Sequence, residues 1–346
     1  MEAEMRIGKK DLRLVTVCPD DTYYTWQVHL WLENLRERGL SDRAIVLLYI
    51  PKGRQFNEKW NQIINLYTEA EFVKYEDEHN NNNLVSIYIP ILRPYTMWRW
   101  LTDFPEMKNK AIFYYDSDVL LTEHFNLDAY IDDDVNYVSD TNSYINASYF
   151  DSKIKDVLPD KLEEYKKIDV LDDVAKLVGI DRQTCELHNN DSGGAQYLLK
   201  DMDAKFWEKV KKDCINIYVY LGNINKVYFK DENTGFQKWC ADMWAVLFNL
   251  WWRGDEVKVV KEMDFAWASD TIDKVDKMGI FHNAGIVSTK HAGSPAFYKA
   301  KYHQGANPFN DPLIQTILDD EGSKKWCTWW YTKKLKELHD KYKLNY

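Results

Sequence analysis

Two aspartates stand two positions apart directly after an apolar run. Asp116 and Asp118 follow residues 111–115, which have the apolar character of a buried strand. In an extended backbone, side chains at i and i+2 lie on the same side, so both carboxylates can bind one Mg²⁺ or Mn²⁺ ion. A cation there would stabilise the charge that builds up on a departing diphosphate. The alternative is a pair of surface loop aspartates, but the end of a strand is where α/β sheets bind their ligands.

A polar segment that contains two adjacent glycines covers residues 189–196. Gly193 and Gly194 allow the backbone to approach a ligand closely, and the polar side chains around them can hydrogen-bond sugar hydroxyls. The segment precedes residues 197–210, for which we predict a helix. Its other interpretation is therefore a polar turn, with Asp191 or the serine after it as the helix N-cap.

Two single ionisable residues stand in otherwise apolar surroundings. Asp242 is the one acidic residue of a predicted helix over 238–248. A buried carboxylate must be paired or face a site, so Asp242 is a candidate catalytic or sugar-binding group, unless it is exposed at the start of the helix. His282 could complete a metal shell, although a single histidine is more often structural. His291 and His303 follow closely and compete for that role.

The first half of the chain alternates between predicted strands and helices. The strands are 12–19, 44–51, 84–90 and 111–121, and the helices are 22–40, 56–72 and 93–105. This alternation predicts an α/β fold with a mostly parallel central sheet flanked by helices. Neither a G-x-G-x-x-G motif nor a P-loop follows any of the strands, so a glycine-rich phosphate cradle is not indicated.

We expect one α/β domain followed by an extension. The domain covers residues 1–305, with a nucleotide-binding half at about 11–140, a helical insertion at about 151–187 and an acceptor and sugar half at about 188–305. Residues 306–346 form a C-terminal helical extension. Its last part, 326–346, has the pattern of an amphipathic basic helix that packs its tryptophan face on the body of the protein.

Composition narrows the classes of protein. A net charge of −10 and a pI near 5.4 argue against a protein that coats nucleic acid non-specifically. The five cysteines are widely spaced, which favours reduced structural thiols. The N-terminus lacks the apolar core of a signal peptide, and no apolar stretch reaches 18 residues. We therefore expect a cytoplasmic protein without membrane contact, in the host cytoplasm if it is viral.

Taken in order, the motifs resemble those of a known enzyme family. A strand followed by D-x-D, a D-x-G-G-x-Q segment, a D-M-W helix and H-x-x-G are similar to the Rossmann-like GT-A glycosyltransferases. The resemblance covers most of residues 11–305. Its nearest members are the hydroxyproline arabinosyltransferase and peptidyl-serine galactosyltransferase group and the related phage (TET-associated) DNA glycosyltransferases.

The resemblance implies a role for each matched residue. It implies a nucleotide-sugar donor, a UDP-sugar, and Mn²⁺ or Mg²⁺ as the cofactor. Asp116 would contact the ribose or the metal, and Asp118 and His282 would be metal ligands. Gly193, Gly194 and Gln196 would line the donor-sugar pocket, and Asp242 would contact the reacting sugar. The nucleotide base would lie around Asp20. Tyr24, with Tyr23 and Trp26 beside it, is the candidate ring for stacking on the base. If the transfer inverts, the base is Asp242 or Asp191.

The acceptor remains open on the sequence alone. One candidate is a 5-hydroxymethyl-pyrimidine in phage DNA, which would need a local basic surface such as Arg93, Arg99 and the lysine-rich C-terminal helix. A protein or small-glycan hydroxyl is the alternative. Two other classes compete with a transferase: an aspartyl-phosphate phosphatase, with Asp116 as nucleophile and Asp118 as acid and base, and a non-catalytic sugar-binding scaffold. The sugar, the stereochemistry and the oligomeric state are not determined by the sequence.

Overall fold

The computed structural model describes residues 11–77 and 88–343. Contacts within the chain divide it into two compact units, each assembled from separate segments. We name them after one buried carboxylate in each. The Asp118 unit contains residues 14–77, 115–127 and 262–343, and the Asp242 unit contains residues 11–13, 88–114 and 128–261. The predicted division of the chain after residue 305 stays a prediction.

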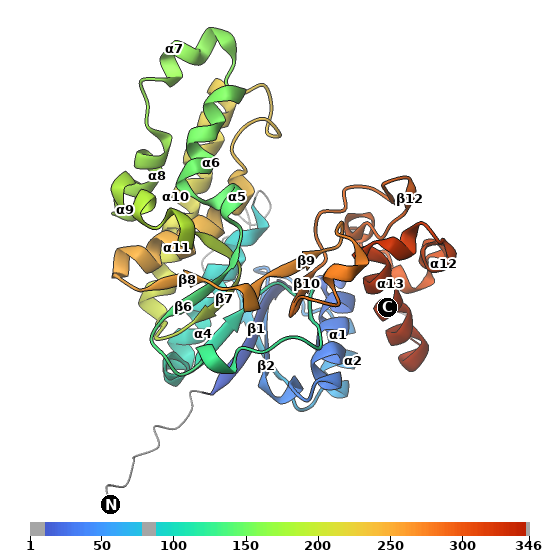
Figure 1. The fold of residues 1–346 in the computed structure, drawn as a ribbon. Helices are drawn as coiled ribbons and strands as arrows, with labels where there is room; N and C mark the ends of the chain where they lie inside the picture. Colours follow the sequence, from blue (N-terminus) through green and yellow to red (C-terminus); the bar gives the residue numbers. More distant parts are fainter. Residues whose placement is uncertain (1–10, 78–87, 344–346) are drawn as a thin grey trace, which may run out of the picture. The chain divides into compact units, whose positions relative to one another are not determined.

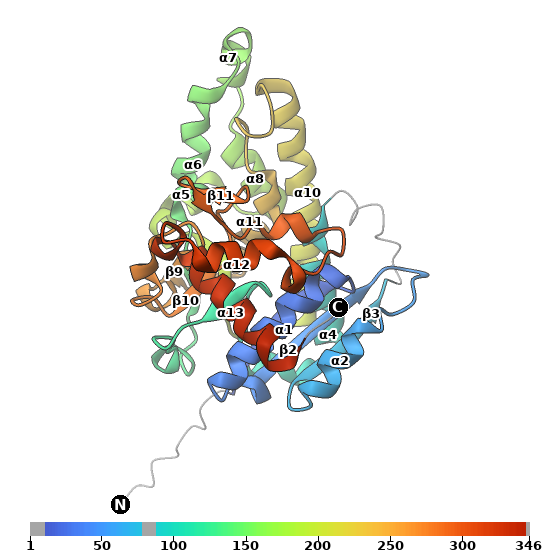
Figure 2. The same cartoon turned by 90° about the vertical axis from the view of Figure 1, so that its right-hand side faces the viewer.

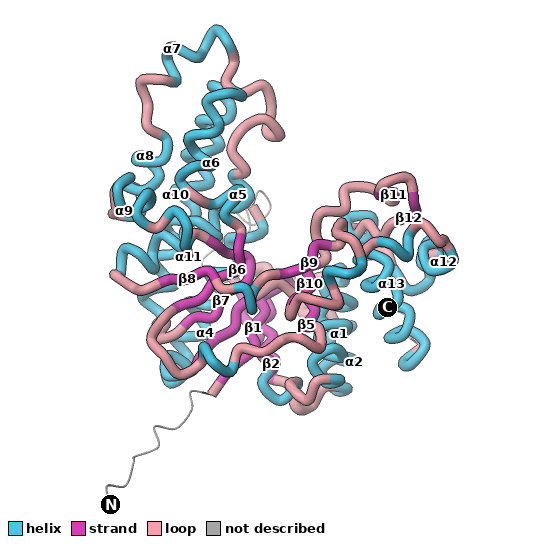
Figure 3. The backbone as a smooth tube through the Cα atoms, viewed as in Figure 1, coloured by secondary structure: helices cyan, strands magenta, loops and turns pink. Residues whose placement is uncertain are grey.

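A seven-stranded sheet forms the centre of the fold (Figures 1 and 3). Its strands lie in the order β3 (Glu71–Glu76), β2 (Ala44–Ile50), β1 (Leu12–Pro19), β4 (Ala111–Tyr114), β7 (Gly193–Leu199), β6 (Asn136–Asp140) and β8 (Val257–Val259). β1, β2 and β3 pair in parallel, as do β6 and β8, whereas β7 runs antiparallel to both β4 and β6. The predicted α/β class, with a mostly parallel sheet flanked by helices, is confirmed.

The Asp118 unit packs its helices around an aromatic core. The helices are α1 (Thr22–Glu37), α2 (Lys59–Leu66), α12 (Pro312–Asp319) and α13 (Cys327–Tyr342). Two smaller sheets join them, one of β5 (Val119–Leu121), β10 (Ile280–His282) and β9 (Phe265–Trp267), the other of β11 (Lys290–His291) and β12 (Ser294–Pro295). Helix α13 packs against α1, as Figure 2 shows. The predicted C-terminal helix is confirmed.

The tryptophans of α13 pack against the core as predicted, but they are not its most buried residues. Tyr331, Leu335 and Leu338 are the residues that enter the core, together with Trp26 of α1. The tryptophans at 329 and 330 are only partly buried. The i, i+4, i+7 spacing of the tyrosine and the leucines defines the apolar stripe, and the tryptophans lie beside it.

The Asp242 unit contains most of the described helices, including the longest, α10. They are α4 (Leu92–Asp103), α5 (Asn142–Ile145), α6 (Ala147–Ser152), α7 (Leu162–Tyr165), α8 (Val170–Val178), α9 (Arg182–Leu187), α10 (Ala204–Tyr228) and α11 (Ala241–Arg253). Helix α10 packs against both α4 and α11. The predicted helical insertion is confirmed by α7, α8 and α9. In the part of the chain that the structure describes, no helix has the length and apolar character needed to cross a bilayer.

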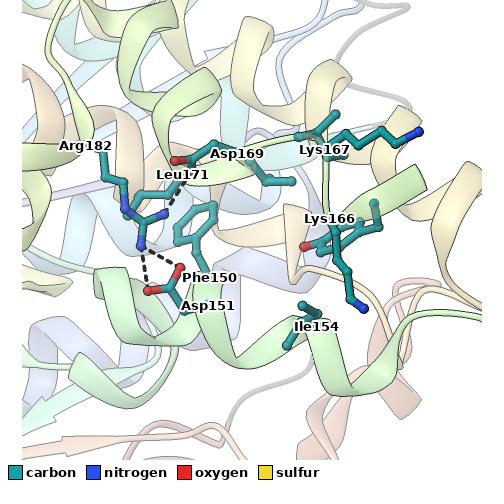
Figure 4. Close-up of a pocket in the computed structure, with 11 residues that line it drawn as sticks. Phe150, Asp151, Ile154, Lys166, Lys167, Asp169, Leu171 and Arg182 are labelled. Atoms are coloured by element: carbon teal, nitrogen blue, oxygen red, sulfur yellow. Dashed lines mark hydrogen bonds and ion pairs between the residues drawn. The ribbon is translucent and has the colours of Figure 1, made fainter. Parts of the chain in front are cut away.

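A cavity of about 470 Å³ lies in this insertion (Figure 4). Its wall is held together by Arg182, which forms ion pairs with Asp151, Asp169 and Glu186. The guanidinium is therefore already occupied by three carboxylates from the insertion itself. We assign this cluster to the stability of the insertion.

Four predicted elements need correction. The helix over 56–72 ends at Leu66, and its last residues belong to β3. The strand over 84–90 falls mostly outside the described residues, and Ile89–Ile91 forms a 3₁₀ turn. The strand over 111–121 breaks into β4 and β5, which belong to different sheets.

The predicted helix over 197–210 was wrong at its start. Gly193–Leu199 is strand β7, because pairing on both edges stabilises an extended backbone regardless of local helical spacing. The following helix, α10, has Asp203 as its N-cap, whose side chain accepts a hydrogen bond from the Phe206 N–H at 2.9 Å. Neither Asp191 nor Ser192 is therefore an N-cap.

Candidate active site

The aspartate pair lies where the chain leaves the central sheet. β4 ends at Tyr114 and β5 begins at Val119, so Asp116 and Asp118 occupy the connection between two sheets. β5 then pairs antiparallel with β10, and the register places Val119 opposite His282. The backbone carbonyl of Asp118 accepts the Asn283 N–H at 3.0 Å, which extends the pairing by one residue. Strand pairing therefore brings His282 to the aspartates across more than 150 residues of sequence.

The three predicted ligands converge. His282 Nε2 lies 3.6 Å from Asp118 Oδ1 and 3.8 Å from Asp116 Oδ2. One ligand atom from each residue falls within 4.8 Å of the others, and within the described residues this is the one cluster of three acidic, histidine or cysteine side chains that meets this criterion. Asp118 and His282 are buried, whereas Asp116 is partly exposed. The His282 ring stacks on Trp267 with 5.7 Å between centroids, which fixes its orientation.

Lys299 is a site residue that sequence reasoning missed. Its ammonium forms an ion pair with Asp118 Oδ2, and about a third of its side chain remains exposed. It lies two positions from Lys301 in a segment without a known motif, so no local signal marks it. Only the tertiary fold shows that this lysine faces the aspartates.

The electrostatics of Asp118 are set by opposing effects. Burial raises the pKa of its carboxyl, but the charges of Lys299 and His282 and a hydrogen bond from Lys299 outweigh burial, so the pKa falls below its ordinary value. The nearby Tyr23 hydroxyl responds in the opposite direction, because burial and the Asp118 charge both raise its pKa. Asp118 is therefore a carboxylate at neutral pH and is ready to bind a cation.

The donor set fits a divalent metal ion. Two carboxylates and one imidazole suit a hard or borderline divalent cation, and three protein ligands leave coordination positions for phosphate oxygens. Because Asp116 is the more exposed of the two carboxylates, it is the one better placed to contact a bound substrate as well. Asp116, Asp118 and His282 are thus the residues that would hold the ion.

The other two candidate histidines, His291 and His303, contact other parts of the protein. His291 Nε2 lies 3.0 Å from the Ser269 carbonyl oxygen. The His303 ring packs edge-on against Tyr23 with 4.3 Å between centroids. Of the three candidates, His282 is the one that joins the aspartates.

The predicted nucleotide-base site divides into core and surface residues. Trp26 is 1% exposed and packs against Phe297 and Tyr302, and Tyr23 also belongs to the core. The prediction that these two rings stack on a base is wrong, because the i, i+3 spacing along α1 turns both toward the core. Tyr24 lies off that stripe and is partly buried, so its role stays a prediction.

Asp20 remains a candidate with a defined environment. Its Oδ2 accepts the Asn57 N–H at 2.9 Å, and burial raises the pKa of its carboxyl. The neighbouring Asp21 has a structural role, since its side chain accepts the Tyr23 N–H at 2.8 Å and caps α1. Nucleotide contact by Asp20 stays a prediction.

Asp242 lies in a separate buried cluster within its own unit. It stands in the first turn of α11, is 6% exposed and forms an ion pair with Arg93 at 2.5 Å. The Tyr88 hydroxyl donates to its Oδ1 at 3.2 Å and accepts its backbone N–H at 3.0 Å. The alternative of an exposed residue at a helix start was wrong. Arg93, proposed for a basic DNA surface, is instead the counter-ion of a buried carboxylate.

The glycine pair approaches protein atoms. A Cβ added to Gly193 would lie 2.2 Å from the Ser139 carbonyl oxygen, and one added to Gly194 would lie 2.6 Å from the Tyr197 hydroxyl. Gln196 is buried, and its Oε1 accepts the Ser139 hydroxyl at 2.6 Å. The pairing of β7 with β6 therefore explains Gly193, and the Tyr197 and Met243 side chains explain Gly194. The predicted donor-sugar roles of these residues, and that of the partly buried Asp191, stay predictions.

Comparisons with known proteins give structural matches alone. No family model matches the chain, and no curated protein matches it. Among solved structures, it is similar to the galactosyltransferase LgtC in complex with donor and acceptor sugar analogues, at 12% identity over 96% of this chain and 97% of that one, with a TM-score of 0.43. It is also similar to the bifunctional glycosyltransferase WbbM, at 9% identity over 95% of this chain and 52% of that one, with a TM-score of 0.42. This chain therefore spans about half of the WbbM chain. An active-site mutant of LgtC is a third match, at 10% identity over 85% and 94% of the two chains, with a TM-score of 0.39.

Proposed function

We propose that the protein is a metal-dependent glycosyltransferase of the GT-A class, which moves a sugar from a nucleoside diphosphate donor, a UDP-sugar, to an acceptor hydroxyl. The convergence of Asp116, Asp118 and His282 is the observation that carries the proposal. A bound Mn²⁺ or Mg²⁺ ion would supply stabilisation of the negative charge on the leaving diphosphate.

The residues around the cluster have complementary tasks in this proposal. Strand pairing fixes the backbone of Asp118, and the Trp267 ring orients the imidazole of His282, so both ligands are held before substrate binds. Lys299 adds a positive charge beside them, which suits an anionic diphosphate. Asp20 and Tyr24 remain the proposed contacts of the nucleotide base.

Asp242 is the proposed carboxylate for the sugar side of the reaction, with Asp191 as the alternative. Arg93 and Tyr88 fix the orientation of the Asp242 carboxylate from two sides. A group held so firmly suits the positioning of a sugar hydroxyl near the reacting carbon. If the transfer inverts, one of these two carboxylates would accept the proton of the attacking hydroxyl.

The contacts of the basic residues bear on the acceptor. For a hydroxymethylated base in DNA, the basic surface would have to form without Arg93, which pairs with Asp242. Arg99 donates to the Tyr95 hydroxyl at 3.3 Å, and Lys341 of α13 pairs with Glu33. The Tyr95 hydroxyl is neutral, so only the ion pairs of Arg93 and Lys341 favour a small-glycan or protein hydroxyl over DNA as the acceptor.

Donor hydrolysis tests the proposal directly. Wild-type protein and Asp118→Asn are incubated with a panel of nucleotide sugars and Mn²⁺ or Mg²⁺, with and without hydroxymethylated DNA, and the released nucleoside diphosphate is measured. Asp273→Asn, which changes an exposed aspartate paired with Lys277, is the matched control. We expect metal-dependent release from one donor, lost in Asp118→Asn and kept in Asp273→Asn.

The alternatives give different results in the same experiment. Hydrolysis of an aryl phosphate without any nucleotide-sugar turnover would replace the proposal with a phosphatase. Metal-dependent donor binding without turnover would indicate a sugar-binding scaffold. Stimulation by hydroxymethylated DNA alone would identify DNA as the acceptor.

A further inference from the structure

One tyrosine of the C-terminal helix packs behind the candidate metal ligands. Tyr331 of α13 is fully buried, and its ring stacks on Phe281 with 5.6 Å between centroids. Phe281 immediately precedes His282 on β10, and it lies opposite Leu120 of β5 in the strand register. The core that contains Tyr331 therefore supports both the strand that ends in His282 and the strand that follows Asp118.

Asn283 connects this core to Asp118. The Asn283 N–H donates to the Asp118 carbonyl at 3.0 Å, one residue beyond the paired strands. Asn283 is 2% exposed and Asp118 is 4% exposed, so both lie on the buried side of the ligand cluster. Because His282 precedes Asn283 directly in the chain, a shift of Asn283 would move two of the three candidate ligands.

The side chains of Tyr331 and Asn283 are polar groups within the core. The Tyr331 hydroxyl and the Asn283 amide nitrogen are buried, and within the described residues neither atom forms a hydrogen bond of good geometry. The two side chains still interact, because burial and the Asp118 charge raise the pKa of Tyr331, whereas hydrogen bonding to the Asn283 side chain lowers it. Buried polar groups in native proteins are almost always paired, so we pair these two with each other.

We propose that Tyr331 is a positioning residue for the metal ligands: its hydroxyl holds the Asn283 side chain, and Asn283 holds the backbone of Asp118 and the adjacent His282. Groups behind metal ligands fix the orientation of those ligands, and changing such groups typically weakens metal affinity. The C-terminal helix is then a part of the site as well as of the core. This inference rests on the proposed function, because it takes Asp116, Asp118 and His282 as the ligands of an ion.

The Mn²⁺ affinity of the full chain tests this role. Isothermal titration with MnCl₂ is carried out on wild type, on Tyr331→Phe and on Asp118→Asn, which identifies binding at the cluster. Tyr331→Phe keeps the ring that stacks on Phe281 and removes only the hydroxyl. We expect this variant to bind Mn²⁺ about tenfold more weakly than wild type. Tyr67→Phe is the matched control and should bind like wild type, because the Tyr67 hydroxyl is also buried but donates to Glu33.

A second variant shows whether the hydroxyl acts through Asn283. Asn283→Ala keeps the backbone N–H that donates to Asp118 but removes the amide side chain. It should also weaken Mn²⁺ binding, and the double variant with Tyr331→Phe should bind no more weakly than the weaker single variant, because both changes break one interaction. Losses that multiply in the double variant would overturn this route from Tyr331 to the ligands.

The outcomes separate the positioning role from the proposed function. Donor hydrolysis by wild type is measured in parallel, and urea denaturation confirms that each variant is folded. If wild type hydrolyses a donor but Tyr331→Phe binds Mn²⁺ as wild type does, the positioning role is wrong and the transferase stands. An equal loss of affinity in Tyr67→Phe would likewise reduce Tyr331 to a packing role. If Mn²⁺ binding depends on Asp118 and Tyr331 but no donor is hydrolysed, the positioning role stands and the transferase fails. Mn²⁺ binding that Asp118→Asn leaves unchanged would remove both.

Discussion

Two buried carboxylates, one in each unit, are neutralised in different ways. Asp118 faces the ammonium of Lys299, whose side chain is 31% exposed, and the imidazole of His282. Asp242 faces the guanidinium of Arg93, which is 18% exposed. A lysine ammonium is a point charge on a flexible chain, whereas a guanidinium is a rigid fork.

The Lys299 ammonium can move away from its carboxylate more easily than the Arg93 guanidinium can. At Asp118, a metal ion would compete with the lysine ammonium for the carboxylate, and Asp116 and His282 would supply the two further ligands. At Asp242, the rigid partner and the Tyr88 hydroxyl hold the carboxylate in one orientation. The Asp118 cluster could therefore hold a metal ion, whereas substrate positioning by Asp242 remains part of the proposed function.

The largest expected effect concerns the ion pair of Arg93 and Asp242. Arg93→Met leaves the Asp242 charge buried without its partner, and removing one member of a buried pair costs about 3–5 kcal/mol. Urea denaturation should show this loss in the free energy of unfolding. Adding Asp242→Asn should restore part of it, since the uncompensated charge disappears. An unchanged stability in Arg93→Met would mean that the two carboxylates do not differ in this respect.

Asp118→Asn tests whether this carboxylate binds the metal ion that turnover would require. We expect donor turnover to fall about 10²–10³-fold, because a neutral amide is a poor ligand for a divalent cation and the leaving charge loses its stabilisation. Release of nucleoside diphosphate at saturating donor and Mn²⁺ measures the effect. Turnover above half of the wild-type value would contradict the assignment of Asp118 to the ion.

Gly193→Ala tests whether the close packing of β7 in the Asp242 unit contributes to stability. The added methyl group would meet the Ser139 carbonyl oxygen at 2.2 Å, so β7 or β6 must shift. We expect a loss of about 1–3 kcal/mol in the free energy of unfolding, measured by chemical denaturation. Gly222→Ala is the control, because its nearest neighbour, the Lys238 Cδ, would be 3.7 Å away. Equal stability of both variants would remove the packing explanation for Gly193.

Lys299→Met should have the smallest effect of the four substitutions. Unlike Asp118→Asn, it should strengthen metal binding. Removing the ammonium frees Asp118 of a competing cation, so the affinity for Mn²⁺ should rise about tenfold. Isothermal titration with MnCl₂ measures it, and Lys299→Arg, which keeps the charge, is the control. Unchanged or weaker Mn²⁺ binding would show that the lysine does not compete for the site.

Local patterns determined much of the secondary structure. The apolar runs of β1 and β2 and the helical spacing of α1, α4, α11 and α13 predicted these elements within a few residues, because their periodicity and end signals lie within each segment. The same holds for the D-x-D motif at a strand end. The apolar neighbours of Asp242 suggested a buried carboxylate but left exposure at the helix start open, and the structure shows that it is buried.

Long-range pairing decided the rest. The register of β5 on β10 brings His282 to the aspartates, and not His291 or His303. The H-x-x-G spacing favoured His282 only through the family resemblance, which says nothing about the distance between the ligands. Strand pairing on both edges of β7 made the first residues of a predicted helix extended, because hydrogen bonds to β4 and β6 outweigh local spacing. Lys299 and Arg93 became partners of buried carboxylates only through the fold. Sequence determines which residues can do chemistry, whereas tertiary packing determines which of them meet, because contacts between distant segments depend on the whole chain.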